Sequence, residues 1–154
     1  MSGYYAVLGS DISSGKSSLW QSFAIPVGVD QLAVSFSYNF AGYDTAPFQA
    51  DTALAVLKQS FWFFSTANEL LEASSPGDYS SGTYYGVVNV ANWFGIDATT
   101  GELIFSLYES SPWLGSTNSL FAVDNVSVAA VPEPSTMLLL GLGLVGFAAA
   151  RRRK

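Results

Sequence analysis

The sequence contains no cysteine and no histidine among its 154 residues. Without cysteine the chain forms no disulfide, and thiolate metal centres are excluded. Without histidine, neither a Ser-His-Asp nor a Cys-His catalytic arrangement can be built. Catalysis would have to depend on carboxylates, a lysine or a tyrosine. The missing residue types therefore exclude many hydrolases and metalloenzymes, and we expect a non-enzymatic protein without a cofactor.

Positive charge is scarce outside the last four residues. Residues 1–130 contain two cations, Lys16 and Lys58, against eleven aspartates and glutamates. A surface this acidic repels phosphate backbones, so we expect no nucleic-acid partner. The segment 9–17 has the glycines and the lysine of a phosphate-binding loop, but five residues separate the glycines where four are required. We interpret it as a surface turn.

The body of the chain is rich in aromatic residues, valine, serine, threonine and glycine, a composition typical of β-structure. Apolar and small or polar residues alternate strictly over 32–40, as in a half-buried strand. Further strands are predicted at 18–25, 52–59, 85–90, 102–108 and 120–128, separated by Gly and Pro turn signals. The pattern predicts an all-β fold, a jelly-roll-like antiparallel β-sandwich over 1–130. Phe61–Phe64 is typical of a buried strand, whereas 67–73 is compatible with helical turns.

The C-terminal residues 131–154 have a different organisation. Pro132 and Pro134 flank Glu133 and hold it on an extended backbone, the form that peptide-cleaving enzymes bind. An uncharged run over 137–150 follows, and the chain ends in four cations. These cations are Arg151, Arg152, Arg153 and Lys154.

The uncharged run predicts a hydrophobic helix over 136–150 that enters a membrane. Its 14 residues from 137 rise about 21 Å as a helix, less than a hydrocarbon core of about 30 Å. Long Arg and Lys side chains can extend to the far interface, so the short run is sufficient. The cationic end 151–154 stays cytoplasmic by the positive-inside rule, and the body lies outside.

The Pro132-Glu133-Pro134 motif, the short apolar helix and the Arg-rich end together resemble the PEP-CTERM sorting tail of bacterial envelope proteins. The resemblance covers 131–154 and implies a membrane-embedded processing enzyme, an exosortase, as a partner, together with inner-membrane lipid. It implies export, transient insertion of the tail in the inner membrane, and delivery to the cell surface or extracellular matrix. An exported protein is expected to begin with a secretory signal, but residues 1–5 have neither a basic start nor an apolar core. An unprocessed tail-anchored membrane protein is the alternative.

The body also resembles jelly-roll domains of the carbohydrate-binding-module type, at 17–23, 32–40 and 123–128. In the last segment an Asp-Asn pair interrupts the alternation, as in the closing strand of many such sandwiches. An extracellular carbohydrate-binding module is therefore a further alternative, with a polysaccharide as partner. Aromatic rings stack on the C–H faces of sugars. The candidate stacking residues are Trp113, Trp93, Trp62, Tyr84 and Tyr85, with Asn89, Asn92 or Gln49 to bond hydroxyls.

Two kinds of carboxylate site are also considered. Calcium accepts irregular oxygen cages, which four aspartates could supply, although turn formation explains each of them as well. These aspartates are Asp11, Asp44, Asp51 and Asp124. Glycoside hydrolysis would need a facing carboxylate pair, Glu69 with Glu72 or Glu102 with Glu109, but isolated glutamates on a sandwich are usually solvated charges.

Overall fold

The computed structural model describes residues 5–9, 15–42, 51–74, 79–109, 119–132, 142 and 151. Within these ranges the chain forms ten β-strands, and every strand pair is antiparallel. The strands are β1 (Ala6–Leu8), β2 (Gly15–Ala24), β3 (Gln31–Ala41), β4 (Thr52–Phe61), β5 (Phe64–Ser74), β6 (Tyr79–Asn89), β7 (Asn92–Trp93), β8 (Ile96–Asp97), β9 (Thr100–Glu109) and β10 (Leu120–Ala130).

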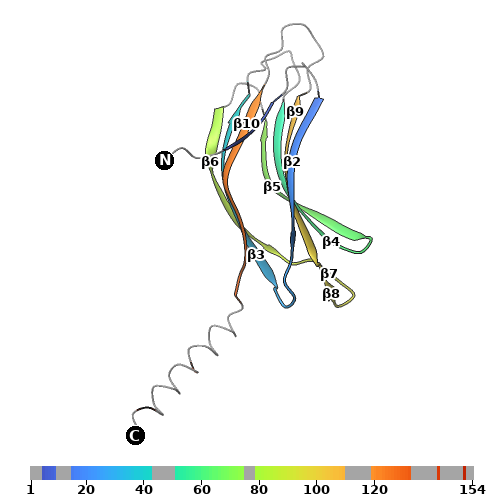
Figure 1. The fold of residues 1–154 in the computed structure, drawn as a ribbon. Helices are drawn as coiled ribbons and strands as arrows, with labels where there is room; N and C mark the ends of the chain where they lie inside the picture. Colours follow the sequence, from blue (N-terminus) through green and yellow to red (C-terminus); the bar gives the residue numbers. More distant parts are fainter. Residues whose placement is uncertain are drawn as a thin grey trace.

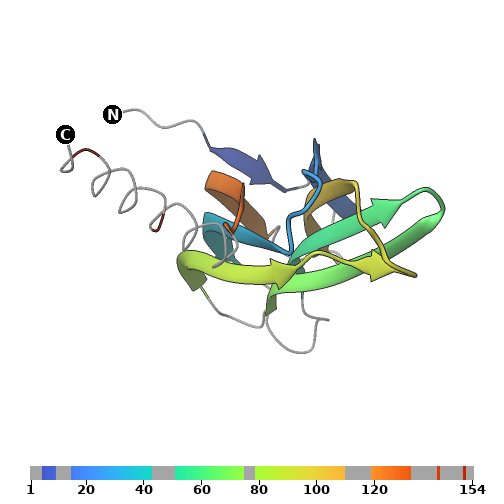
Figure 2. The same ribbon diagram turned by 90° about the horizontal axis from the view of Figure 1, so that it is seen from below.

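Eight of these strands, all except β7 and β8, form two four-stranded sheets. Their orders are β1-β10-β3-β6 and β2-β9-β4-β5, and β7 and β8 form a separate small hairpin. Figure 1 shows the two sheets facing each other, and Figure 2 shows the layers from below. The all-β antiparallel class predicted from the sequence is confirmed, and the two facing sheets are consistent with a sandwich.

The core lies between the sheets and is built from alternate residues of the central strands. On β3, Leu32, Val34 and Phe36 are at most 2% exposed, as their alternation predicts. The ring of Phe36 contacts Phe105 of the opposite sheet edge-on, with centroids 5.1 Å apart. Each large side chain buried in this way stabilises the fold by about 1.5–3 kcal/mol. The remaining core residues are Leu8, Ile25, Phe40, Ala53, Ala55, Leu57, Ala98, Leu103, Leu107, Phe121 and Val123.

All six predicted strands are present, although several extend further than the sequence indicates. The segment 52–59 lies within β4, and 102–108 lies within β9. The strand predicted at 85–90 is the second half of β6, which begins at Tyr79. Sequence reasoning missed β1, β7 and β8, because strands of two or three residues are too short to show a period of two.

The predictions for residues 61–73 are wrong. Phe61–Phe64 is the turn of the β4–β5 hairpin, and its central residues Trp62 and Phe63 are 85% and 79% exposed. Residues 67–73 belong to strand β5, which pairs with β4 on both sides of a register shift at Leu70, and form no helical turn. Pairing along β4 overrides the weak helical preference of this segment.

The interruption expected at the Asp-Asn pair is present in β10. The register against β3 shifts between Asp124 and Ser127, which marks a β-bulge. Asn125 has φ 52°, and its N–H donates a 2.7 Å hydrogen bond to Oδ1 of Asp124. Asn tolerates left-handed backbone better than most residues, so the bulge suits this sequence.

Almost all of the predicted C-terminal helix, 136–150, lies outside the described residues. Leu142 is the described member of the apolar run, and its side chain is 61% exposed, so it is not part of the core between the sheets. Among the residues that the structure describes, no helix has the length and hydrophobicity that crossing a bilayer requires.

Candidate functional site

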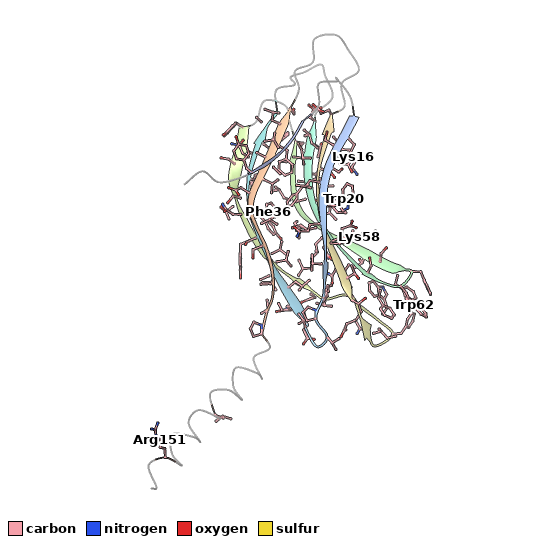
Figure 3. The ribbon with its side chains drawn as sticks, in the orientation of Figure 1. Lys16, Trp20, Phe36, Lys58, Trp62 and Arg151 are labelled. Atoms are coloured by element: carbon pink, nitrogen blue, oxygen red, sulfur yellow. The ribbon has the colours of Figure 1, made fainter. Side chains whose placement is uncertain are left out.

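The β4–β5 hairpin carries exposed aromatic residues at its turn. Phe61 pairs with Phe64, which leaves Trp62 and Phe63 as the two-residue loop. Trp62 has φ 53°, in the left-handed region that bulky side chains rarely occupy. Such a conformation costs about 1–2 kcal/mol for a non-glycine residue. The fold thus holds an exposed indole at the tip of a strained turn, and Figure 3 shows Trp62 at the outer end of this hairpin.

The β7–β8 hairpin repeats this arrangement on a smaller scale. Its loop is Phe94-Gly95, with φ values of 56° and 84°, the signs of a type I′ turn. Asn92 fixes the turn, because its Oδ1 accepts from the N–H of Gly95 at 2.9 Å and its Nδ2 donates to Asp97 at 2.7 Å. Phe94 is 92% exposed.

The two hairpins meet through their rings. Phe64 stacks on Trp93 with centroids 6.0 Å apart and contacts Phe94 edge-on at 6.0 Å. Phe63 lies against Phe64 at 4.5 Å. We call Trp62, Phe63, Phe64, Trp93 and Phe94 the aromatic tips. Phe64 and Trp93 are partly buried at the base, and the other three rings are exposed.

Gln59, fully buried near the end of β4, holds the hairpins together. Its Nε2 donates to the carbonyl oxygen of Asn89 at 3.0 Å, and its Oε1 accepts from the N–H of Ala91 at 2.9 Å. The N–H of Thr99 donates to the carbonyl oxygen of Ser60 at 3.0 Å. These bonds join the second sheet to the segment that leaves the first sheet, so the small hairpin is fixed beside the larger one.

The chain leaves the sandwich toward the sorting motif at this same end. Ala130, the last residue of β10, pairs with Leu32 near the start of β3, and the N–H of Val131 donates to the carbonyl oxygen of Gln31 at 2.9 Å. The β2–β3 loop is also here, with Val27 98% exposed. Glu133 and Pro134 of the motif lie outside the described residues, whereas Pro132 is exposed.

The predicted carbohydrate residues are only partly brought together. Trp62 and Trp93 belong to one cluster, whereas Trp113 and Gln49 lie outside the described residues. Tyr84 points inward and stacks on Phe36 at 5.0 Å. The remaining three candidates are either bonded within the protein or located on the outer face of the first sheet. Tyr85 is exposed on the outer face, Asn89 accepts from Gln31, and both polar atoms of Asn92 are used within its own hairpin.

Sequence reasoning missed a hollow of about 390 Å³ on the first sheet. It lies along β3 and β10 and combines aromatic and polar groups. Its lining residues are Tyr5, Ser37, Tyr38, Asn39, Ala122, Val123 and Asp124. Ser37 and Asn39, two residues apart on β3, together with the partly buried Asp124 on β10, could have indicated a polar outer face, but not its concave shape.

The calcium candidates are not assembled within the described residues. Asp11 and Asp44 lie outside them. Asp51, immediately before β4, is 1% exposed and accepts a 2.7 Å hydrogen bond from Oγ of Ser119. Asp124 lies on the other sheet and accepts from the N–H of Asn125. Across the described part of the chain, no group of three potential acidic ligands comes together.

The candidate carboxylate pairs have different surroundings. Glu102 and Glu109 lie on one strand, seven residues apart, so about 23 Å separates them along β9. A glycosidase pair requires about 5–9.5 Å, which excludes this pair. Glu69 and Glu72 are both exposed on β5. Glu102 forms a 3.9 Å ion pair with Lys58.

Lys16 and Ser17, the end of the segment with phosphate-loop glycines, belong to strand β2. The ammonium group of Lys16 lies 4.9 Å from the ring centroid of Tyr108. This is a cation–π contact on a sheet face and not a phosphate cradle.

Residues 130–154 match the PEP-CTERM protein-sorting motif. The resemblance noted in the sequence is therefore confirmed. The motif implies an exported protein that is routed by way of the membrane to the cell surface, with an exosortase, a membrane protease, as its processing partner. This class is defined by a tail of 25 residues, which says nothing of what the body does.

Among solved structures, the body is similar to a chain described as "CBM4 structure and function", at 13% identity, with a TM-score of 0.44 and coverage of 81% of this chain and 82% of that one. A second likeness is to a chain from a "Structure of infectious bursal disease virus Gx strain", at 11% identity and a TM-score of 0.29, covering 88% of this chain and 42% of that one. No curated protein matches the sequence.

Proposed function

We propose that this chain is a non-enzymatic β-sandwich domain of the cell surface or extracellular matrix, delivered there by cleavage of its C-terminal tail. The observation that carries the proposal is the sorting motif at 130–154. In this mechanism the apolar run enters the inner membrane and the four terminal cations remain on the cytoplasmic side. The body is then outside, and the exosortase severs the chain at Pro132-Glu133-Pro134.

The described fold extends up to the residue before Pro132, and this supports the proposed role. The bond from Val131 to Gln31 fastens the last residue before Pro132 to the sandwich. Pro132 donates no backbone hydrogen bond and resists continuation of the ladder. The processing site therefore begins immediately outside the fold, where an enzyme can bind it without unfolding β10.

The test is intact-mass spectrometry of the full chain expressed with and without an exosortase. We expect the mature protein to lack the residues beyond about Pro134 when the enzyme is present, and to remain full-length in the membrane without it. Glu133→Gln should block cleavage, whereas Glu72→Gln, an exposed control on β5, should leave it unchanged. A released protein that still ends in Lys154 would reject the proposal. Full-length membrane protein in both strains would indicate a permanent tail anchor.

Carbohydrate binding is a second candidate, favoured by the hollow on the first sheet. Tyr5 is 67% exposed there, and Ser37 and Asn39 lie beside it. An aromatic ring next to hydroxyl and amide groups is the combination that a sugar ring requires. Affinity electrophoresis in polysaccharide gels tests it. Tyr5→Ala should restore free mobility, while Tyr85→Ala, equally exposed but outside the hollow, should not. Trp113→Ala tests the remaining predicted stacking residue.

A further inference from the structure

We infer that the aromatic tips insert into the membrane interface beside the tail, so that the body lies with this end against the bilayer before it is cleaved. The inference rests on the proposed function, because it requires the apolar run to be in the membrane. It adds a second, reversible membrane contact, made by the folded domain itself.

Three loops at one end of the sandwich carry apolar residues where turns normally carry polar ones. Val27 in the β2–β3 loop is 98% exposed, and Trp62 and Phe94 occupy the two hairpin turns. Single exposed apolar residues are ordinary, but an exposed group of this kind marks an interaction surface. Aromatic rings are favoured at the headgroup level of a bilayer.

Backbone geometry indicates that these rings are selected for something other than stability. Both Trp62 and Phe94 have left-handed φ values that Gly or Asn would adopt with less strain. Strain of this kind persists where the residue has a function. The exposed rings have no core to fill, so their function lies in contact with something outside the chain.

The path of the chain identifies the membrane as that contact. Six residues, 131–136, connect the end of β10 to the apolar run at Met137. They span at most about 20 Å when fully extended. The end of the sandwich that carries the tips is therefore tethered near the bilayer surface, whereas the opposite end, where β6 begins at Tyr79, is held a full strand length away.

The polar groups near the tips favour lipid over a sugar. Asn92 and Asp97 bond to each other, and Gln59 is committed to Asn89 and Ala91. The amide groups of Asn92 and Gln59 are therefore already bonded within the protein. Asp30 and Asp97 are acidic, so attraction to anionic headgroups does not drive the contact. Insertion driven by apolar area should be insensitive to salt.

The absence of cysteine makes the test direct. Full-length protein with a single cysteine is labelled with a polarity-sensitive NBD dye and reconstituted into phosphatidylcholine vesicles with or without brominated acyl chains. Labels at Phe63→Cys, Phe94→Cys and Val27→Cys report the three loops. Val27→Cys removes no ring, so it remains informative if an aromatic variant folds poorly. Tyr79→Cys, 68% exposed at the opposite end, is the matched control, and Leu140→Cys reports insertion of the tail.

We expect brominated lipid to lower the emission of the loop labels about twofold or more, as for groups buried 5–10 Å into the interface, and to leave the Tyr79 label unchanged at low and high salt. If Leu140 is quenched but the loop labels behave like Tyr79, this inference is wrong and the proposed function stands. If Leu140 is not quenched either, tail insertion itself fails. Loop labels that are shielded by added polysaccharide but not by lipid would assign the tips to a sugar and overturn the membrane contact.

Discussion

The backbone N–H of Ala91, between β6 and β7, donates a 2.9 Å hydrogen bond to Oε1 of Gln59, a fully buried side chain on β4. The same side chain donates to the carbonyl oxygen of Asn89. Gln59→Met keeps the volume but removes the partner of two partly buried backbone groups, each loss costing about 1–2 kcal/mol. We expect the free energy of unfolding to fall by about 2–4 kcal/mol in urea denaturation.

Gln31→Met is the control for Gln59→Met, because Gln31 also bonds Asn89 but at an exposed position. It should change the free energy of unfolding by about 0.5 kcal/mol or less. If the two variants lose the same free energy of unfolding, the buried hydrogen bonds of Gln59 contribute no more stability than the exposed bond of Gln31.

Gly101 and Gly82 form a second matched pair. A Cβ at Gly101 would collide with the ring of Phe23, its register partner on β2, including Cε1 at 2.9 Å. A Cβ at Gly82 would meet Tyr38 no closer than 3.5 Å, an ordinary contact. Gly101→Ala should therefore lower the free energy of unfolding by about 1–3 kcal/mol through overpacking. Gly82→Ala should leave it unchanged or raise it by up to about 1 kcal/mol. Thermal unfolding of both variants measures the difference. A Gly82→Ala protein less stable than Gly101→Ala would contradict the packing described here.

Phe94→Asn should remove an exposed ring without harming the fold. The substitution places Asn-Gly in the turn, the pair that type I′ hairpins prefer, and relieves about 1 kcal/mol of strain. The loss of the edge-on contact with Phe64 offsets part of this gain. We expect a free energy of unfolding between the wild-type value and about 1 kcal/mol above it. A drop of more than about 2 kcal/mol in urea would mean that Phe94 is structural.

Ser119 should contribute more stability than its size suggests. Its hydroxyl, with 0% exposure, donates to the buried carboxylate of Asp51 at 2.7 Å. Hydrogen bonds to charged groups contribute about 1.5–3 kcal/mol, so Ser119→Ala should lower the free energy of unfolding by that amount. Ser17→Ala, which loses only an exposed 3.3 Å bond to the carbonyl oxygen of Gly9, serves as control in the same denaturation series. A loss from Ser119→Ala no greater than that of Ser17→Ala would contradict the assignment.

Much of the fold could be predicted because a strand buried on one face alternates apolar and polar residues along the sequence. The range 32–40 shows this most clearly. The interruption at Asp124-Asn125 was expected from the resemblance to the closing strand of carbohydrate-binding-module sandwiches. Phe61–Phe64 could not be assigned, because four consecutive aromatic residues have no period and ordinary turn preferences argue against a turn there. The turn exists because β4 and β5 pair on both sides of it, which is a tertiary cause.

The sorting tail could be predicted from its motif, whereas the aromatic tips could not. Trp62 and Trp93 were candidates, but nothing in the sequence indicates that Phe64 brings them together. A signal for the small hairpin existed in Gly95 between Asn92 and Asp97. Gln59 occupies an inward position after Leu57, and a polar residue at such a position should prompt a search for the buried groups it bonds.

The short first strand has a consequence for how copies of the domain behave together. β1 pairs with β10 only at Phe121–Val123, and no other described strand pairs with that border of β10 from Asp124 to Ala130. An unoccupied border invites a strand from a neighbouring molecule, which is how sheets grow into fibrils. The kink at Asn125 breaks the regular spacing of donors and acceptors at the start of this stretch. An incoming strand would find no continuous row to follow along this part of β10, so the bulge disfavours strand addition at this border.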